Sequence, residues 1–335
     1  MTRPAGAARP PRRGGALALA VAALIGANLF WAGNYAFSPT AVAELSPSGL
    51  AAWRWAFSAP VLLVLAALLD RPDWRAVLRR WPTHLTQSLL GFSGFSLFTY
   101  LAVEQISPVN AALVQTLNPA LILVLTGIAT RLAPTRREVL GIAVSMVGVV
   151  IVLLGPGADL ANPGSTGLGL LYMVGAIVTW GFYTVRGRRQ VDPPVTGTAM
   201  QAVFAMLVTV PIAAATGDLH LDVSAAAFGS LVYIALGASV AAMILWNYGV
   251  VRTGPNAAGA SLNLLPVFTA AIAAVLGAPL VPVQFIGGAL VLVGMWFVTR
   301  KPAAPPGAAD RADGVDPQGP ADPPSPSGPV VSGRG

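Results

Sequence analysis

Residues 107–119 read SPVNAALVQTLNP and residues 254–266 read GPNAAGASLNLLP, so a proline, a run of small residues and a second proline recur at a shift of 147. Residues 141–148 read GIAVSMVG and residues 287–294 read GGALVLVG, which continues the match at a shift of 146. The match covers two apolar segments in each copy. The chain therefore contains an internal repeat, and this repeat decides how its apolar segments are arranged.

The composition identifies the solvent of these segments. The chain has 335 residues, of which 55% are apolar and 10% charged, whereas an average soluble domain has about 25% charged residues. A soluble protein with so little charge would expose large apolar patches, so we predict a membrane protein. The lack of cysteine excludes disulfides, thiol nucleophiles and iron–sulfur clusters.

Windows of about 20 mostly apolar residues, the length that crosses a bilayer, predict an all-α polytopic membrane protein with ten transmembrane helices. Proline and glycine mark the breaks between them. The predicted spans are residues 15–37, 48–69, 86–105, 109–130, 138–155, 166–185, 197–216, 226–250, 255–277 and 282–299.

Each half holds an odd number of spans, so the second copy enters the membrane upside down. We predict two inverted five-helix repeats, over residues 15–155 and 156–301. A disordered basic segment, 1–14, and a disordered tail rich in proline and glycine, 302–335, flank them. Inverted repeats are typical of secondary carriers, because exchanging the roles of the two halves converts an outward-facing packing into an inward-facing one.

The basic residues predict the orientation. With the N-terminus inside, every Arg and Lys except Arg54 falls in an inside segment, and the outside loops hold none. This distribution obeys the positive-inside rule. It predicts a multi-pass protein of the cell (plasma or inner) membrane with both termini cytoplasmic. The net charge of +7 then reflects orientation, and no nucleic-acid partner is expected.

An aromatic residue followed by small residues ends the first span, as Trp31-Ala32-Gly33-Asn34, and recurs in the sixth, as Trp180-Gly181-Phe182-Tyr183. The other motifs are Arg54 in the second span, the proline-centred fourth and ninth spans, and the paired glycines of the fifth and tenth. Together and in this order they make the chain resemble the EamA-type carriers of the drug/metabolite transporter (DMT) superfamily over residues 15–300. The resemblance implies transport of small metabolites and favours export.

Arg54 is the only ionisable residue well inside a predicted span. As a binding residue, its planar set of donors would hold an anionic group, such as a carboxylate, in an outward-open cavity. As a structural residue, it would extend to the outer headgroups or pair with Glu44 or Glu104. The sequence leaves both alternatives open.

Two prolines near the middle of the fourth and ninth spans, Pro119 and Pro266, are predicted to kink these helices and free backbone carbonyls. Gln115, Asn118 and Asn263 lie within about a turn and a half of them. A role in lining the substrate cavity is favoured over simple interhelical hydrogen bonding.

The sequence leaves open a role in the cavity wall for four aromatic residues, Trp31, Tyr100, Trp180 and Tyr183, and for Asn247. Trp53 and Trp55, near a helix end, are typical of an interfacial belt. The predicted substrate-binding set is Asn34, Arg54, Tyr100, Gln115, Asn118, Trp180, Tyr183, Asn247 and Asn263.

Two further groups have structural interpretations. The glycines of the repeated octapeptide lie seven apart in each copy, on one helix face, and are predicted to allow close helix packing. They are Gly141, Gly148, Gly287 and Gly294. His84 and His220 fall in loops on opposite sides of the membrane and are predicted to be solvated.

The sequence favours a carrier over other classes of membrane protein. It contains no phosphate-binding loop, no carboxylate at mid-depth of a span and no nucleophile with a base in the spans. We therefore expect neither an ATP-driven pump nor an enzyme, and no cofactor or metal. The prediction is an alternating-access carrier for amino-acid-like or drug-like solutes in the lipid bilayer. A channel-like permease and a scaffold that recruits partners through the tail are the alternative functions to test. A homodimer is a separate question, of oligomeric state.

Overall fold

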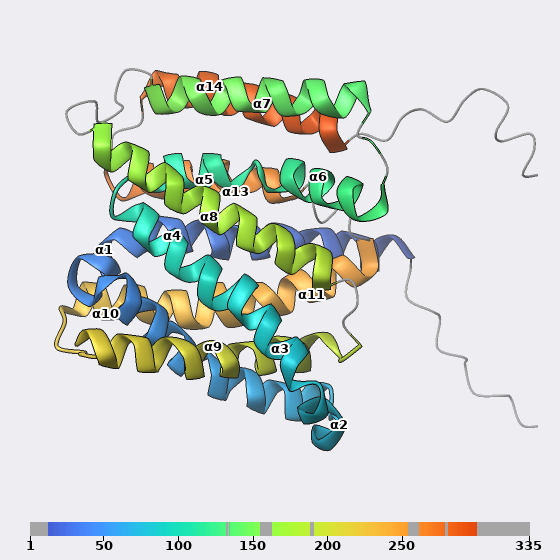
Figure 1. The fold of residues 1–335 in the computed structure, drawn as a ribbon, viewed down its shortest axis with the longest axis vertical. Helices are drawn as coiled ribbons and strands as arrows, with labels where there is room; N and C mark the ends of the chain where they lie inside the picture. Colours follow the sequence, from blue (N-terminus) through green and yellow to red (C-terminus); the bar gives the residue numbers. More distant parts are fainter. Residues whose placement is uncertain are drawn as a thin grey trace, which may run out of the picture. The chain divides into compact units, whose positions relative to one another are not determined.

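The computed structural model describes residues 13–131, 133, 135–154, 163–187, 191–253, 261–278 and 281–299. Within these residues the chain forms helices and no strand, which confirms the all-helical class (Figure 1). All of the described helices belong to one unit, Met1–Thr299. The predicted disordered termini lie outside the described residues, except that α1 already begins at Arg13.

The helices of the first half are α1 (Arg13–Leu69), α2 (Trp74–Arg79), α3 (Trp81–Gln87), η1 (Ser88–Gly94), α4 (Phe95–Val103), α5 (Pro108–Gln115), α6 (Asn118–Thr130) and α7 (Arg136–Leu154). Those of the second half are α8 (Pro163–Gly187), α9 (Pro194–Thr216), α10 (Ala225–Val232), η2 (Tyr233–Ala241), α11 (Ala242–Thr253), η3 (Leu262–Leu264), α13 (Leu265–Val275) and α14 (Pro282–Thr299).

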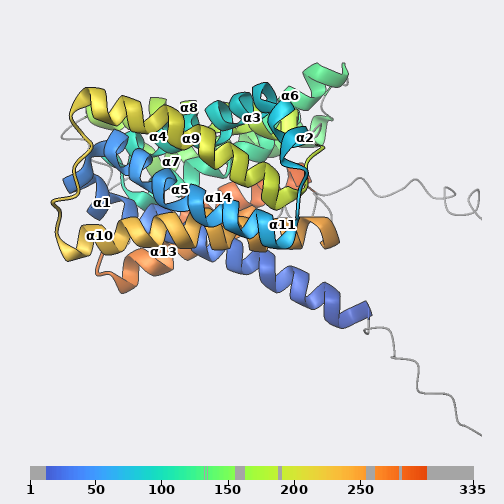
Figure 2. The same cartoon turned by 90° about the horizontal axis from the view of Figure 1, so that it is seen from below.

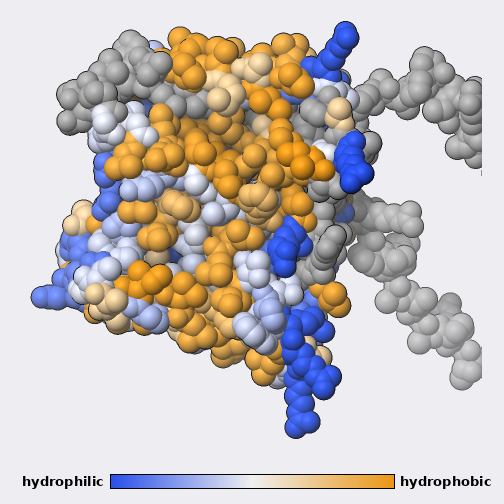
Figure 3. Space-filling model, viewed as in Figure 1, coloured by the Kyte–Doolittle hydropathy of each residue, from blue (hydrophilic) through white to orange (hydrophobic). Residues whose placement is uncertain are grey.

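The apolar surface of the molecule is that of a multi-pass membrane protein. Four helical stretches are long and apolar enough to cross a bilayer, Ala16–Leu69, Gly164–Arg186, Pro194–Thr216 and Ala225–Val250, and Leu262–Val275 and Pro282–Gly294 are shorter apolar helices. Apolar residues cover the middle of the face seen in Figure 3, and hydrophilic residues gather at its two edges. This distribution matches a bilayer solvent with aqueous layers on both sides.

Two of the predicted spans are joined into α1. The helix bends at Ser46, whose backbone has φ 60° and ψ 163°, and Pro47 follows. A positive φ is uncommon for serine and marks a sharp change of direction. We call residues 13–45 the first arm and residues 47–69 the second arm of α1.

The helices α7 and α14 lie side by side in contact through glycines (Figure 1). A Cβ atom added to Gly148 would lie 2.5 Å from the backbone oxygen of Gly287, and one added to Gly294 would lie 2.4 Å from that of Gly141. The residue numbers rise along α7 while those of their partners fall along α14, so the two helices are antiparallel. The predicted close packing of these glycines is confirmed.

The second arm of α1 and α9 are also antiparallel, and a hydrogen-bonded pair joins them at each end (Figure 1 and Figure 2). At one end, Asp70 Oδ2 accepts from the backbone N of Thr196 at 2.7 Å and from its Oγ1 at 2.8 Å. At the other end, Asp218 Oδ2 accepts from Ser48 Oγ. At a shift of 148 residues, Ser48 corresponds to Thr196 and Asp70 to Asp218, so the two pairs are equivalent.

Where α3 meets α9, the structure corrects the prediction of a solvated His84. Its side chain is 1% exposed, and its Nε2 lies 3.2 Å from Asp192 Oδ2. The same carboxylate accepts from Arg80 Nε at 3.0 Å and from Arg80 Nη2. His84 is part of a helix that packs on the bundle rather than of an open loop, so water cannot surround it.

Stability should depend on pH through His84. Burial lowers the pKa of His84, an effect that the nearby Asp192 carboxylate opposes and Arg80 reinforces. Between this lowered pKa and the ordinary value of 6.5, the unfolded chain binds more protons than the folded one. Stability therefore falls as the pH drops below 6.5. Thermal unfolding in detergent at pH 7.5 and 5.5 should show a larger fall for the wild type than for His84→Gln; equal falls would contradict this role.

Candidate functional site

A cavity lies among helices from both halves of the chain, and its empty volume, open solvent included, is about 750 Å³. From the first half, α1, η1, α4, α5 and α6 line it, and from the second half, α8, η2, α11, η3 and α13. Its lining residues are Trp31, Asn34, Tyr35, Arg54, Trp55, Gly91, Phe92, Phe95, Ser96, Gln115, Thr116, Asn118, Trp180, Ala238, Ser239, Met243, Leu262 and Leu265. The walls are thus apolar and aromatic, with a few polar groups, as is usual for small-molecule sites.

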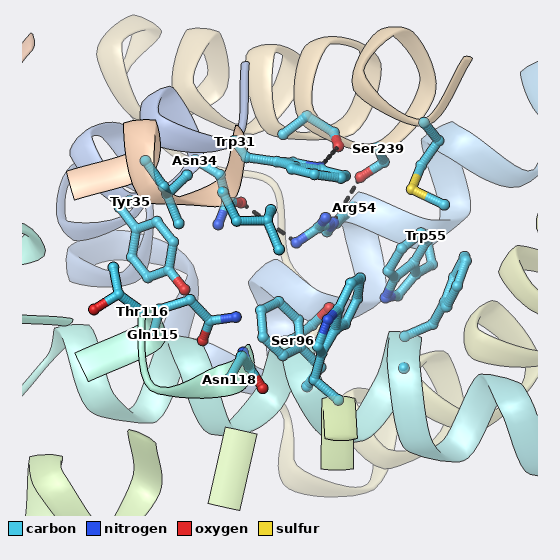
Figure 4. A pocket seen from close by; sticks show the side chains of 18 residues that line it. Trp31, Asn34, Tyr35, Arg54, Trp55, Ser96, Gln115, Thr116, Asn118 and Ser239 are labelled. Carbon is cyan, nitrogen blue, oxygen red and sulfur yellow. Dashed lines mark hydrogen bonds between the residues drawn. The ribbon is translucent and has the colours of Figure 1, made fainter. Parts of the chain in front are cut away.

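Arg54 is the charged side chain among these lining residues (Figure 4). It is 6% exposed. Its Nε donates to Ser239 Oγ at 2.7 Å, and its Nη1 donates to Tyr100 Oη at 2.7 Å and to Asn34 Oδ1 at 3.3 Å. The guanidinium carbon lies 4.7 Å from the centre of the Trp55 ring. Neutral groups on three sides therefore fix the guanidinium in place.

Within the described residues Arg54 is buried and forms no ion pair, so it neither extends to the headgroups nor pairs with Glu44 or Glu104. Its hydrogen bonds do join separate helices. The ion pairs among these residues involve Asp192. Glu44 instead accepts from the backbone N of Ser224 at 2.6 Å and from its Oγ at 2.7 Å, and these hydrogen bonds lower the pKa of Glu44. Glu104 is exposed.

Several buried polar atoms of the cavity wall have no hydrogen-bond partner among the described residues. They are Tyr35 Oη, Trp55 Nε1, Ser96 Oγ, Gln115 Oε1, and both Nδ2 and Oδ1 of Asn118. Leaving a buried donor or acceptor unpaired costs about 1–3 kcal/mol for each group. In Figure 4, Gln115 and Asn118 approach the cavity from the side opposite Arg54. The cavity therefore presents a cation on one wall and a set of unpaired amide and hydroxyl groups on another.

Irregular backbone brings these groups to the cavity. The π-helices η1 and η2 contribute Gly91 and Ser239 to its wall, and short π-helical turns are frequent at functional sites. Ala238 O, in η2, accepts from Trp31 Nε1 at 3.0 Å. Nothing in the sequence analysis predicted either π-helix.

Both predicted kink prolines lie at interrupted helices. Between α5 and α6 the α-helical hydrogen bonds give way to tighter bonds, from Thr116 N to Leu113 O and from Leu117 N to Val114 O, so Pro119 stands in the first turn of α6. Pro266 occupies the same place in α13, after the short 3-10 helix η3. Proline fits the first turn because its missing N–H has no partner there in any helix.

The structure places the predicted binding residues in three groups. Asn34, Arg54, Gln115, Asn118 and Trp180 line the cavity. Behind this wall, Tyr100 bonds to Arg54, while Tyr183 packs 5.1 Å from the Trp180 ring and donates to Gln201 Oε1 at 3.2 Å. The cavity lining does not include Asn247 and Asn263.

Two tryptophans predicted as an interfacial belt separate in the structure. Trp55 is 3% exposed and lines the cavity, so its assignment to the belt is wrong. Trp53 donates from Nε1 to His220 O at 3.0 Å and remains partly exposed. Tyr35, Ser96 and Ser239 also line the cavity and were not predicted to do so. Tyr35 follows directly on the Trp31–Asn34 motif, which was the available signal.

Comparison with known proteins yields one family and several relatives. The family model described as "EamA-like transporter family" matches residues 18–154 and 167–300. The chain is 28% identical over 276 residues to "Uncharacterized transporter YyaM" of Bacillus subtilis (strain 168), covering 81% of this chain and 90% of the relative. It is 26% identical over 281 residues to an "Uncharacterized transporter" of Archaeoglobus fulgidus, covering 81% and 95%. A solved crystal structure, 22% identical, shares the fold with a TM-score of 0.61, covering 84% of this chain and 96% of that one.

Proposed function

The chain belongs to the EamA-like transporter family, and from that premise we propose that it is a secondary transporter that exports a small organic solute by alternating access. One observation carries the proposal. The cavity lies between the two halves and presents the charge of Arg54 together with unpaired buried polar atoms of the first half. A solute in this cavity would supply the missing hydrogen bonds. Transport, and not catalysis, is the activity that the family implies.

Alternating access requires two halves that can exchange roles, and several contacts support ten spans in two inverted repeats, 15–155 and 156–301. The equivalent helices α7 and α14 run antiparallel, as do the second arm of α1 and α9. Arg54 corresponds to Gln201 at a shift of 147, and Asn34 corresponds to Tyr183 at a shift of 149. The hydrogen bond between Arg54 and Asn34 therefore has a counterpart between Gln201 and Tyr183. Contacts that recur in this way are expected when each half is the inverted image of the other.

Orientation and location are part of the proposal. The positive-inside rule supports cytoplasmic termini in the cell membrane, since the predicted outside loops contain no basic residue. A solute that leaves the cell would then pass Arg54 on its way to the face that holds Glu44 and Asp218.

Counterflow in proteoliposomes tests the transport proposal. Purified protein is reconstituted, vesicles are loaded with a pooled metabolite mixture, and entry of labelled solutes is followed with and without the internal pool. Saturable entry that the internal pool accelerates is the expected result. Saturation without acceleration, or linear flux, would identify a channel. No detectable transport of any solute in the pool would favour the scaffold alternative, in which deleting residues 302–335 abolishes function in cells.

A further inference from the structure

We infer that the transported solute is an organic anion whose charged group binds Arg54, and that the membrane potential drives its net efflux. This inference rests on the proposed transport function and specifies the charge class of its solute. It follows from the electrostatics of the cavity and from the positions of its unpaired polar atoms.

The first step concerns the charge of Arg54. A guanidinium cannot lose its proton in a protein, so the cavity wall carries a full positive charge that is 6% exposed. The three hydrogen-bond partners, Asn34, Tyr100 and Ser239, are neutral. Burying a charge without a counter-ion is expensive. An anion in the cavity removes this cost, whereas a cation increases it.

The hydrogen-bond donors of Arg54 and Trp55 are arranged to bind an anionic group. The partners of Arg54 engage Nε and Nη1, and no described residue accepts from Nη2. Trp55 stacks on the guanidinium at 4.7 Å, and the unpaired Trp55 Nε1 adds a second donor on this wall. A carboxylate, sulfonate or phosphate group is an acceptor for both, and charge-assisted hydrogen bonds of this kind are about twice as strong as neutral ones.

The third step concerns the rest of the solute. Across the cavity from Arg54, Gln115 and Asn118 present amide atoms, and Asn118 offers one donor and one acceptor without a partner. These groups match a neutral hydroxyl, amide or carbonyl group. Phe92, Phe95 and Leu265 supply apolar wall to the same cavity. The site is therefore complementary to an anionic head, an apolar body and a neutral polar end.

The membrane potential can supply the energy for net transport of a charged solute. The predicted spans contain no Asp or Glu at mid-depth that could bind a coupling proton or sodium ion, so we expect the solute's own charge to couple its movement to the membrane potential. A potential of 100 mV acts on one charge with about 2.3 kcal/mol. This corresponds to about a fifty-fold change in the solute ratio at which net flux stops. For an anion and an interior-negative cell, the direction is outward.

The charge class is tested with a cell metabolite extract separated by ion exchange into anionic, zwitterionic and cationic fractions. Proteoliposomes are loaded with each fraction, and mass spectrometry identifies the compounds that exchange in a protein-dependent way. We expect exchange of the anionic fraction to exceed that of the cationic fraction at least tenfold. Preferred exchange of cations or zwitterions would overturn the inference and leave the transport proposal intact. No exchange of any fraction would overturn the transport proposal itself.

Variants tie the selectivity to Arg54. Arg54→Gln should lower anion exchange at least tenfold, and Arg54→Lys should keep the preference for anions with weaker apparent affinity. Arg75→Gln removes the same charge from an exposed position on α2 and should exchange like the wild type. Equal anion exchange by folded Arg54→Gln and Arg75→Gln would refute the assignment. If Arg54→Gln does not fold, Arg54→Lys and the wild-type fractions still decide the question.

The role of the potential is tested with the same vesicles and the anionic fraction. Valinomycin and an outward potassium gradient make the interior negative. Net efflux should then be faster than at zero potential, whereas one-for-one anion exchange moves no net charge and should not respond. An equal rate of net efflux with and without the potential would overturn the electrogenic part of the inference.

Discussion

Asn118→Leu is expected to lower solute exchange at least tenfold while the protein becomes no less stable. Asn118 is 1% exposed, lines the cavity, and has no hydrogen-bond partner for either amide atom. The folded protein without solute therefore bears the cost of an unpaired buried amide, about 1–3 kcal/mol. Leucine has a similar size and no polar group, so it removes this cost. The solute, in contrast, loses the donor and the acceptor that Asn118 supplies.

The prediction separates the two interpretations that the sequence left open for Asn118. If the amide held helices together, leucine would destabilise the protein. Asn28→Leu is the matched control, because Asn28 is 0% exposed, is not part of the cavity lining, and donates from Nδ2 to Leu24 O at 2.8 Å and to Ser261 Oγ at 2.9 Å. We expect Asn28→Leu to lower the unfolding temperature in detergent. A similar drop for Asn118→Leu would assign Asn118 to packing.

Properties that depend on local composition could be predicted from the sequence. Low charge and long apolar windows predict a helical membrane protein, and the structure and the family match confirm this class. Arg54 was recognisable as a candidate because a charge within an apolar span is costly and rare. Asn118 was recognisable because it precedes a proline in mid-span.

The remainder of the cavity depends on backbone geometry that no local pattern encodes. The π-helices η1 and η2 bring Gly91 and Ser239 to the cavity, and an α-helical wheel does not predict their direction. Trp55 stands beside Arg54 in the sequence, about 100° away around a helix, yet both side chains reach the cavity because the guanidinium stacks on the indole. Asn263, like Asn118, lies within about a turn and a half of a mid-span proline, but η3 does not present it to the cavity.

His84 illustrates a different limit. Its position between two predicted spans indicated a solvated loop, but α2 and α3 form helices there and bury it beside Asp192. Short helices of six and seven residues carry too little periodic pattern to be separated from a loop. Their burial follows from tertiary packing against α9 and not from their own sequence.

Gly294→Ala is expected to destabilise the protein by about 1–3 kcal/mol, the usual cost of forcing extra volume into a packed interface. The new Cβ would lie 2.3 Å from Ser145 Oγ, 2.4 Å from Gly141 O and 2.6 Å from Ser145 N. Two of these atoms belong to the backbone of α7 and cannot rotate away, so the helices must separate. The separation also lengthens the hydrogen bond from Ser145 Oγ to Val291 O, now 3.1 Å.

Helix propensity acts in the opposite direction and provides the control. Alanine is favoured over glycine within a helix by about 1 kcal/mol, so a glycine without close neighbours should gain stability on substitution. Gly167 in α8 is such a position, since a Cβ there would meet no atom of the described residues within 4 Å apart from its own helix backbone and chain neighbours. Unfolding in detergent, followed by tryptophan fluorescence, should show a higher midpoint for Gly167→Ala and a lower one for Gly294→Ala.

Combining Gly148→Ala with Gly294→Ala tests whether both glycine contacts belong to one antiparallel interface. Gly148→Ala alone should also destabilise, because its Cβ would lie 2.5 Å from Gly287 O and 2.8 Å from Val291 N. Once either alanine has pushed α7 and α14 apart, the second meets less resistance. The combined loss should therefore be smaller than the sum of the single losses, which is how residues that share a backbone shift behave. Strict additivity would mean that each site relaxes locally and that the two contacts are independent.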